Sequence, residues 1–172
     1  MERRLKATLP SGRFSNVPEV RSRTMSAIRG KHNRSTDVQF RMALVRAGIR
    51  GWITHPNLPG KPDVYFPRLR LAVFLDGCFW HGCRRCGHIP KTNSLFWATK
   101  IKRNKNRDRK NTKLLKSQGV VVIRAWEHSI NNAQDLMRVL GSIHDIIRTT
   151  KVVRRRHVPH SKKNKSRPKH QA

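Results

Sequence analysis

Residues 71–81 read LAVFLDGCFWH, a stretch in which a run of apolar residues leads directly into chemically reactive side chains. The apolar part, Leu71–Leu75, predicts a β-strand, and Asp63–Phe66 predicts another strand just before it. The turn between them is short, so the two strands are expected to form a hairpin. Asp63 opens the first strand and Asp76 ends the second. We therefore expect two carboxylates close to one another at one edge of a sheet.

Helical spacing, strand-like runs and breaker residues predict the elements around this hairpin. Helices are expected over Ser22–Arg29, from Ser35 or Thr36 to Gly48, over Ser94–Gln118 and over Asn132–Arg148, and further strands over Trp52–His55 and Val120–Ala125. The last of these strands is largely apolar and is expected to be buried. This order of elements predicts an α/β fold in which helices flank a mixed β-sheet.

The sequence makes more specific predictions for two of these helices. The second helix has apolar residues at helical spacing, namely Val38, Met42 and Val45 together with Phe40 and Leu44. Its start, Thr36-x-x-Gln39, has the form of a capping box. The last helix is expected to face the core with Leu136, Val139, Leu140, Ile143 and Ile147.

The charge of the chain indicates what it binds. The 172 residues include 39 Lys and Arg against 9 Asp and Glu, a formal net charge of +30. Self-repulsion on this scale suggests a polyanionic partner, and nucleic acid fits better than a membrane surface. Ribosomal and nucleoid proteins share this composition, so charge alone indicates no activity. The sequence shows neither a membrane-spanning stretch nor an apolar signal segment, and we expect a cytoplasmic protein.

The folded domain is expected to occupy residues 17–150. Residues 1–16 are basic and contain Pro and Gly, and they predict a flexible N-terminal arm. Residues 151–172 are basic without any acidic residue, which predicts a disordered C-terminal tail.

Three closely spaced cysteines, Cys78, Cys83 and Cys86, predict a metal site rather than a disulfide. Zinc prefers thiolate and imidazole ligands, usually four in a tetrahedron. His88 is one candidate for the fourth ligand, but it is close in sequence to the cysteines. We favour His128, which follows the last predicted strand. A site closed by four protein ligands would be structural. The alternative is a loop with three reduced cysteines.

The few acidic residues leave a short set of candidates for chemistry. Asp37 fits the first turn of a helix, where it complements the helix dipole. Asp63 and Asp76 instead resemble the acids of a restriction-endonuclease-like core, which hold Mg²⁺ against a phosphate. His81 lies five residues after Asp76 and could take a proton from an attacking water. Its alternative role is packing, or metal ligation beside Cys83.

At this point several motifs, in order and with compatible spacing, resemble the very short patch repair (Vsr) endonuclease family. They are Phe74–Cys83, Pro90–Asn93, Phe96-Trp97, Lys100-Ile101, Asn104-x3-Asp108-Arg109, Trp126–His128, Leu58–Asp63 and Arg21-Ser22-x2-Met25-x-Ala27-Ile28. The resemblance covers about residues 21–131, nearly the whole predicted domain. It implies a restriction-endonuclease-like fold, a structural zinc and Mg²⁺-dependent nicking of duplex DNA at a T·G mismatch.

The resemblance also assigns catalytic residues. Asp63 matches the metal-binding aspartate, Asp76 sits where members carry Asp or His beside the metal, and His81 matches the proposed general base. Cys78, Cys83, Cys86 and His128 match the four zinc-ligand positions. Gln39 departs from the pattern, because family members commonly carry a glutamate there near the metal site. Gln39 could orient water or His81, or it could cap its helix with Thr36.

The family's DNA contacts map onto residues outside the catalytic set. Phe79, Trp80 and Trp97 match aromatic side chains that wedge between base pairs beside the mismatch. Lys100 and Asn104 match positions that contact the mismatched pair. Met25 and Ile28 match an N-terminal helix that reaches the DNA from the opposite groove. The other basic side chains of the long helix either follow phosphates or face solvent.

Three hypotheses follow from these observations. The first is a mismatch-nicking endonuclease that acts as a monomer in the cytoplasm on mismatched double-stranded DNA, associated with a prokaryotic nucleoid and with other mismatch-repair proteins as partners. The second keeps fold and cleavage but changes the target, as in homing or defence-associated nicking enzymes. The third is a zinc-stapled DNA-binding protein without catalysis.

Overall fold

The computed structural model describes Leu5, Leu9, Val20 and residues 36–156, with side chains described as far as residue 150. The strands are β1 (Ile53–Thr54), β2 (Val64–Phe66), β3 (Leu71–Asp76) and β4 (Val121–Trp126). The helices are α3 (Asp37–Arg46), the 3-10 turn η2 (Pro67–Leu69), α4 (Ser94–Ser117), α5 (Glu127–Asn131) and α6 (Ala133–Arg156).

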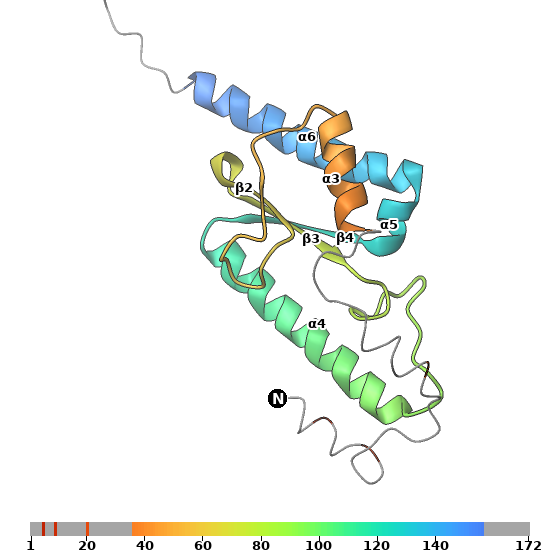
Figure 1. Cartoon of the computed structure of the whole chain (residues 1–172). Coiled ribbons are helices and arrows are strands. Elements are labelled where there is room, and N and C mark those ends of the chain that lie inside the picture. Colours follow the sequence, from red (N-terminus) through yellow and green to blue (C-terminus); the bar gives the residue numbers. More distant parts are fainter. Residues whose placement is uncertain (1–4, 6–8, 10–19, 21–35, 157–172) are drawn as a thin grey trace, which may run out of the picture.

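The four strands form one sheet in the order β1-β2-β3-β4. β1 and β2 pair antiparallel, as do β2 and β3, whereas β3 and β4 are parallel. Parallel neighbours need a long crossover, and α4 supplies it. The sheet lies between α4 on one side and α3, α5 and α6 on the other (Figure 1). The predicted α/β fold with a mixed sheet flanked by helices is therefore confirmed.

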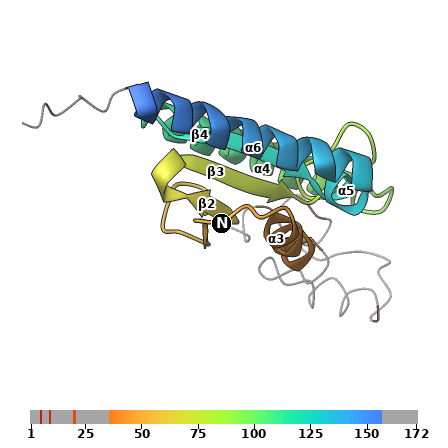
Figure 2. The same ribbon diagram turned by 90° about the horizontal axis from the view of Figure 1, so that it is seen from above.

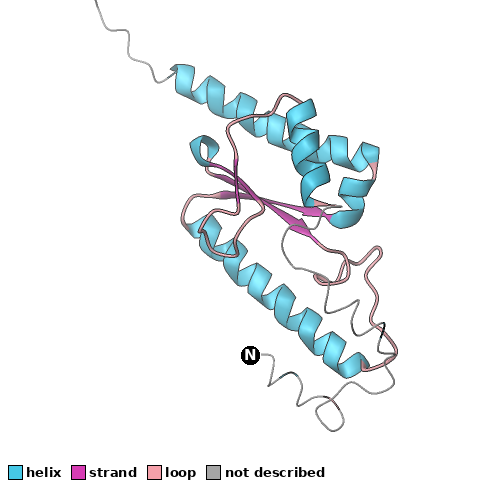
Figure 3. Cartoon of the chain, in the orientation of Figure 1, coloured by secondary structure: helices cyan, strands magenta, loops and turns pink. Residues whose placement is uncertain are grey.

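β3 lies at the centre of this arrangement, covered on both faces. Successive side chains of a strand point to opposite faces. Leu71 and Val73 accordingly pack with residues of α3 and α6, whereas Ala72 and Phe74 pack with Leu115 of α4. Figure 3 shows the strands enclosed between the helical layers. Burial on both faces explains why β3 is a continuous apolar run ending in Asp76.

α6 covers the sheet with the inner face that its sequence predicts. Ile143 is fully buried, and the other four predicted inner residues pack partly buried against the same core. Figure 2 looks down on this layer, with α6 and α3 at separate places over the sheet. α6 continues to Arg156, so it extends beyond the predicted end at Arg148 and into the predicted tail.

Three expectations about local structure are wrong. The strand β4 is an edge strand and only partly buried, because β3 pairs with one side of it alone; Val121 is 45% exposed. The predicted capping box does not form, since the side chain of Thr36 makes no capping hydrogen bond. On α3, Phe40 and Leu44 enter the core, whereas the predicted partners Val38, Met42 and Val45 are exposed.

The N-terminal region is described only in part. The predicted helix Ser22–Arg29, with Met25 and Ile28, lies outside the described residues. Within the predicted N-terminal arm, Leu5 and Leu9 are buried against Phe96 at the start of α4. Among the helices that the structure describes, none combines the length and apolar character needed to cross a membrane.

Candidate active site and metal centre

Asp63 immediately precedes β2 and is fixed beside the C-terminal half of β3. Its backbone N–H donates to the carbonyl of Val73 at 3.0 Å, and its Oδ2 accepts a hydrogen bond from the Leu75 N–H at 2.7 Å. The pKa of Asp63 is raised, first because burial disfavours the charged carboxylate and further because of the negative charges of Asp37 and Asp76. The position thus brings a carboxylate into a site that lacks enough positive charge to balance it.

Asp37, at the start of α3, is the second acid of this site. Its side chain is 7% exposed, and neither carboxylate oxygen has a hydrogen-bond partner among the described residues. Arg41 Nε lies 3.2 Å from Oδ1, and the ring nitrogen Nε2 of His55 lies 3.7 Å from Oδ2. Buried carboxylate oxygens are normally hydrogen-bonded. Asp37 lies close enough to Asp63 for its charge to raise the pKa of Asp63. Two neighbouring buried acids fit Mg²⁺, which is commonly held by one or two carboxylates plus water and phosphate oxygens.

Gln39 lies on the same helix but is turned to another contact. Its Nε2 donates a hydrogen bond to the backbone carbonyl of Ile130 in α5 at 3.1 Å. This contact links α3 to α5. Because Nε2 of Gln39 is engaged there, it neither caps the helix nor orients His81.

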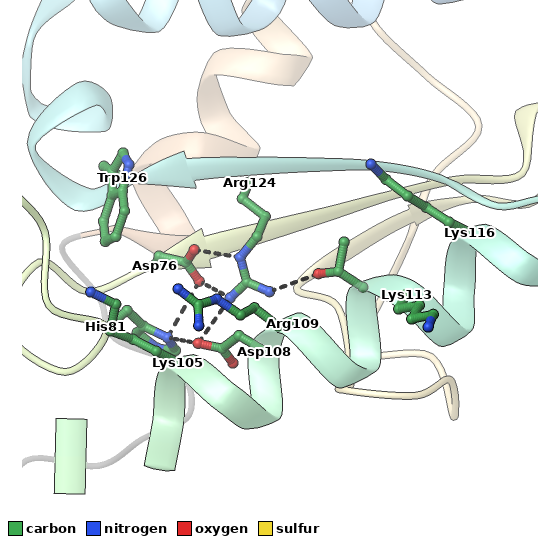
Figure 4. Close-up of a pocket in the computed structure, with 10 residues that line it drawn as sticks. Asp76, His81, Lys105, Asp108, Arg109, Lys113, Lys116, Arg124 and Trp126 are labelled. Carbon is green, nitrogen blue, oxygen red and sulfur yellow. Dashed lines mark hydrogen bonds and ion pairs between the residues drawn. The ribbon is translucent and has the colours of Figure 1, made fainter. Parts of the chain in front are cut away.

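A second group of charged residues lies next to the first, at the C-terminal end of β3, on β4 and on α4. Arg124 of β4 donates to both carboxylate oxygens of Asp76, with its Nε at 2.6 Å from Oδ2. Its Nη2 also lies 3.4 Å from Oδ2 of Asp108, and its guanidinium stacks 4.8 Å above the Phe74 ring. Arg124 therefore joins two carboxylates that would otherwise repel one another (Figure 4).

His81 points into this network. Its Nδ1 lies 2.6 Å from Oδ2 of Asp108 and 3.7 Å from Oδ1 of Asp76 (Figure 4). The pKa of Asp108 is lowered, because the hydrogen bond and charge of His81 and the charge of Arg124 outweigh the opposing effect of burial. When Nδ1 donates to Asp108, the neutral ring presents Nε2 as its basic nitrogen. The pair can accept a proton at Nε2 while Asp108 holds the ring in place.

Cys78, Cys83, Cys86 and His128 come together as the sequence predicts. Their ligand atoms all lie within 4.8 Å of one another, and the three Sγ atoms are 3.2, 3.6 and 3.3 Å from Nδ1 of His128. Zinc bonds of about 2.3 Å to sulfur and about 2.1 Å to nitrogen give a tetrahedral edge of about 3.6 Å. The cluster could therefore hold a metal ion. His88, the other candidate ligand, instead lies beside the Phe79 ring.

The metal cluster also fixes the loop that carries His81. Burial and the neighbouring Cys86 raise the pKa of Cys78 to about 12, so a thiolate there needs a cation. The Cys78 N–H donates to Oε2 of Glu127 at 3.1 Å, which ties the same loop to α5. Gly82 sits in this loop with φ +62 in a close approach to Ile101 of α4. These contacts place the Phe79–His81 segment over α4.

The predicted DNA-contacting aromatics form one cluster. Phe79 lies 5.0 Å from Trp80 and 5.3 Å from Trp97, measured between ring centroids, and Lys100 Nζ lies 5.4 Å from the centre of the Trp80 ring. Asn104 Nδ2 donates to the Trp80 carbonyl at 2.9 Å. All five side chains are half-buried, so the cluster keeps an exposed surface.

Sequence reasoning gave no catalytic role to three residues of this site, although one of them, Asp108, belongs to a motif that carries the family resemblance. From the sequence, Asp37 is expected only to complement the helix dipole. It nevertheless lies two residues before Gln39, where family members commonly carry a glutamate. Asp108 is the single acid of α4, in a helix otherwise rich in Lys and Arg, and that isolation is a usable signal. Arg124 is the one charged residue of β4. A charge inside an apolar strand calls for a buried partner.

Comparisons with known proteins identify relatives of this chain. A family model described as DNA mismatch endonuclease Vsr matches residues 15–87. The type II nicking enzyme V.XorIIP of Xanthomonas oryzae is 35% identical over 130 residues, covering 74% of this chain and 94% of its own length. The type II nicking enzyme V.NaeI of Lentzea aerocolonigenes is 38% identical over 113 residues, 63% and 68% of the two chains.

The DNA mismatch endonuclease Vsr of Escherichia coli is 33% identical over 121 residues, which cover 68% of this chain and 75% of that protein. The residues matched by the family model include β1, β2 and β3, Asp63, His81 and the three cysteines. The restriction-endonuclease-like class predicted for the fold is that of this family. The chain therefore belongs to the Vsr family of DNA mismatch endonucleases.

Proposed function

We propose that this protein is a Mg²⁺-dependent endonuclease that nicks one strand of duplex DNA at T·G mismatches, on the 5′ side of the thymine. The observation that carries the proposal is the juxtaposition of two poorly compensated buried acids, Asp37 and Asp63, with a histidine–aspartate pair, His81 and Asp108. Membership of a DNA endonuclease family also supports cleavage of a DNA strand. The chain has 9 Asp and Glu, and four of them, the three acids just named and Asp76, belong to this site.

In this proposal, Asp63 and Asp37 hold the magnesium ion. The ion supplies Lewis-acid stabilisation of the charge that develops on the phosphate oxygens. Asp76 was predicted as a metal ligand with Asp63, and that role stays a prediction. Its two-point contact with Arg124 favours Asp37 as the second acidic side chain at the metal. Gln39 then acts as a contact between α3 and α5 rather than as a replacement for a glutamate.

His81 serves as the general base. Its Nε2 takes the proton of the attacking water while Asp108 accepts the hydrogen bond from Nδ1 and stabilises the imidazolium that forms. The water oxygen bonds to phosphorus, the bond from phosphorus to the 3′ oxygen breaks, and the leaving 3′ oxygen takes a proton from solvent water, so one strand is cut. Arg124 keeps Asp76 and Asp108 in fixed positions around the imidazole.

The aromatic cluster supports the preference for mismatches. Phe79, Trp80 and Trp97 are grouped on the loop and helix beside His81. Inserting such side chains costs a few kcal/mol per base step, least at a mispaired step. Lys100 and Asn104, which adjoin the cluster, are proposed to contact the mismatched pair. Met25 and Ile28 are proposed to reach the DNA from the other groove.

The cysteine cluster is proposed to hold a structural zinc ion. A set of three thiols and one imidazole suits zinc and leaves no position open for a substrate. We further propose that the protein acts as a monomer in the cytoplasm, at the nucleoid, with other mismatch-repair proteins as partners.

A second candidate keeps the nick and changes the target. It is favoured by the description of two relatives as type II nicking enzymes, words that name a nick and no mismatch. A DNA-binding protein without catalysis is the third candidate.

One assay separates the three. End-labelled duplexes carrying T·G or C·G are incubated with the protein and Mg²⁺, and the products of each strand are resolved. We expect a single nick in the T·G duplex. Equal cutting of both duplexes would support the second candidate, and two intact duplexes would support the third. Asp63→Ala should abolish the nick while DNA binding remains; undiminished cutting would remove Asp63 from the site.

A further inference from the structure

Four basic residues of α4 line up beside the proposed active site. They are Lys105, Arg109, Lys113 and Lys116, hereafter the basic row. With 3.6 residues per turn, spacings of four, four and three residues place the side chains within an arc of about 80° on one face of the helix. All four line a pocket of about 530 Å³ that also contains His81 and Arg124 (Figure 4).

The charge of this row is not balanced locally. Among the residues that the structure describes, no carboxylate forms an ion pair with any member of the row. The two acids in the pocket, Asp76 and Asp108, are already engaged with Arg124 and His81. Four adjacent cations without counter-charges repel one another, and a polyanion that lies along them relieves the repulsion.

The position of the row along α4 sets its relation to the cut. The aromatic cluster contacts α4 at Trp97, and Asp108 follows eleven residues later. At a rise of 1.5 Å per residue, Trp97 and Asp108 are separated by about 16 Å along the axis, and Asp108 and Lys116 by about 12 Å in the same direction. The part of the row beyond Asp108, from Arg109 to Lys116, extends about 10 Å along the axis. One DNA strand carries a phosphate about every 3.4 Å of helix axis, so this part spans about three phosphates.

We propose that the basic row binds the phosphodiester backbone of duplex DNA. Lys105 lies nearest the scissile phosphate, and the rest of the row lies on its side away from the aromatic cluster. The aromatic cluster and the row then hold the duplex on opposite sides of His81. This inference rests on the proposed function, because it assumes that His81 lies at the bond that is cut. The contacts are to phosphates, so they add affinity and register without reading base sequence.

The test compares two double variants that each remove two positive charges from α4. Lys113→Gln with Lys116→Gln neutralises half of the row. The matched control is Arg103→Gln with Arg107→Gln, exposed residues that lie about 120° and about 160° around the helix axis from the centre of the row. The Kd for T·G and C·G duplexes is measured without Mg²⁺ between 50 and 200 mM salt, roughly the range over which counterion release is well resolved.

Each phosphate contact contributes about 0.9 to the slope of log Kd against log salt. We expect the row variant to lower this slope by about 1.8 and to weaken both duplexes equally, while the control changes the slope by less than half as much. Methylphosphonates placed on the flank away from the aromatic cluster should weaken binding by wild type more than binding by the row variant, which keeps Lys105 and Arg109. Equal slopes for the two variants, or no change in the row variant, would overturn the proposal.

The binding assay also separates this proposal from the proposed nicking activity. If the slope of log Kd against log salt falls in the row variant as expected but wild type cuts neither duplex, the interface stands and the nicking proposal fails. If wild type nicks the T·G duplex and the row variant keeps its slope, nicking stands and the interface fails.

Discussion

Nδ1 of His81 lies 2.6 Å from Oδ2 of Asp108, the single acidic residue of α4. The contact joins the loop after β3 to the long helix and leaves Nε2 of the imidazole as the nitrogen that can take a proton. It also places the negative charge of Asp108 where an imidazolium would form. The pair is therefore expected to contribute to the chemical step and not to DNA affinity.

We expect Asp108→Asn to lower the single-turnover nicking rate by about 10²–10⁴, the usual contribution of general acid–base catalysis. The amide cannot stabilise an imidazolium, although it fills the same volume. Gel-shift measurements should show unchanged affinity for the duplex. Asp135→Asn, on α6, is the control and should cut normally. A variant at position 108 that cuts at the wild-type rate would show that His81 works without this partner.

Arg124 and Asp76 form a largely buried ion pair, with side chains 24% and 5% exposed. Removing one partner leaves an uncompensated buried charge, so Arg124→Met should lower the free energy of unfolding by about 3–5 kcal/mol. Adding Asp76→Asn should recover much of the loss. Urea unfolding measures both. Arg138→Met removes an exposed pair with Asp135 and should cost less than about 1 kcal/mol. Similar losses for Arg124→Met and Arg138→Met would mean that the buried pair is not structural.

Two substitutions distinguish between His128 and His88 as the fourth ligand of the metal cluster. His128→Ala should lose the bound metal, because Nδ1 of His128 lies within 3.6 Å of all three sulfurs. His88→Ala should retain it, because His88 lies beside Phe79. Metal analysis of the purified proteins should give one zinc per chain for wild type and His88→Ala. A folded wild-type protein without bound metal would refute the cluster.

The raised pKa of Asp63 predicts a conflict between stability and activity. Its ionised form is less favourable in the folded, magnesium-free protein than in the unfolded chain, first because of burial. Asp63→Asn cannot ionise and can still accept the hydrogen bond from Leu75. Near pH 7 without Mg²⁺, this variant should therefore unfold at a higher temperature than wild type.

The gain should shrink as the pH falls. The wild-type carboxyl takes up a proton as the pH passes through its raised pKa, and the unfavourable charge disappears. Thermal unfolding between pH 7 and pH 4 measures the difference. A wild-type protein that is the more stable one at pH 7, or a gap that does not narrow on acidification, would contradict this account of Asp63.

Much of the fold could be predicted because its signals are local. The apolar run of β3 and the period of α6 each report burial directly, and both gave the right element. The exposure of β4 could not be predicted, because whether a strand has one neighbour or two depends on the whole sheet. The same holds for α3, where two apolar stripes compete and the sheet selects the one that contains Phe40.

The site was predictable where residues lie close in sequence or follow known metal spacing. The cysteines and Asp63 belong to this class. Asp37 and Arg124 do not, because their partners are distant in the chain and are brought near only by folding. Gln39 was predicted to act near the metal because of its position in the helix. The direction of its side chain is instead set by the hydrogen bond that its Nε2 donates to the backbone carbonyl of Ile130.

The central claim is that Asp37 and Asp63 together hold the magnesium ion that His81 works beside. The most direct measurement is the Mg²⁺ concentration needed for half-maximal single-turnover nicking of a T·G duplex by wild type, Asp37→Asn and the control Asp145→Asn, with Mg²⁺ binding to each protein followed by calorimetry. The account predicts that Asp37→Asn needs at least about tenfold more Mg²⁺, a loss of about 1.4 kcal/mol, and binds Mg²⁺ more weakly, while Asp145→Asn matches wild type. An unchanged Mg²⁺ requirement and affinity in Asp37→Asn would contradict it.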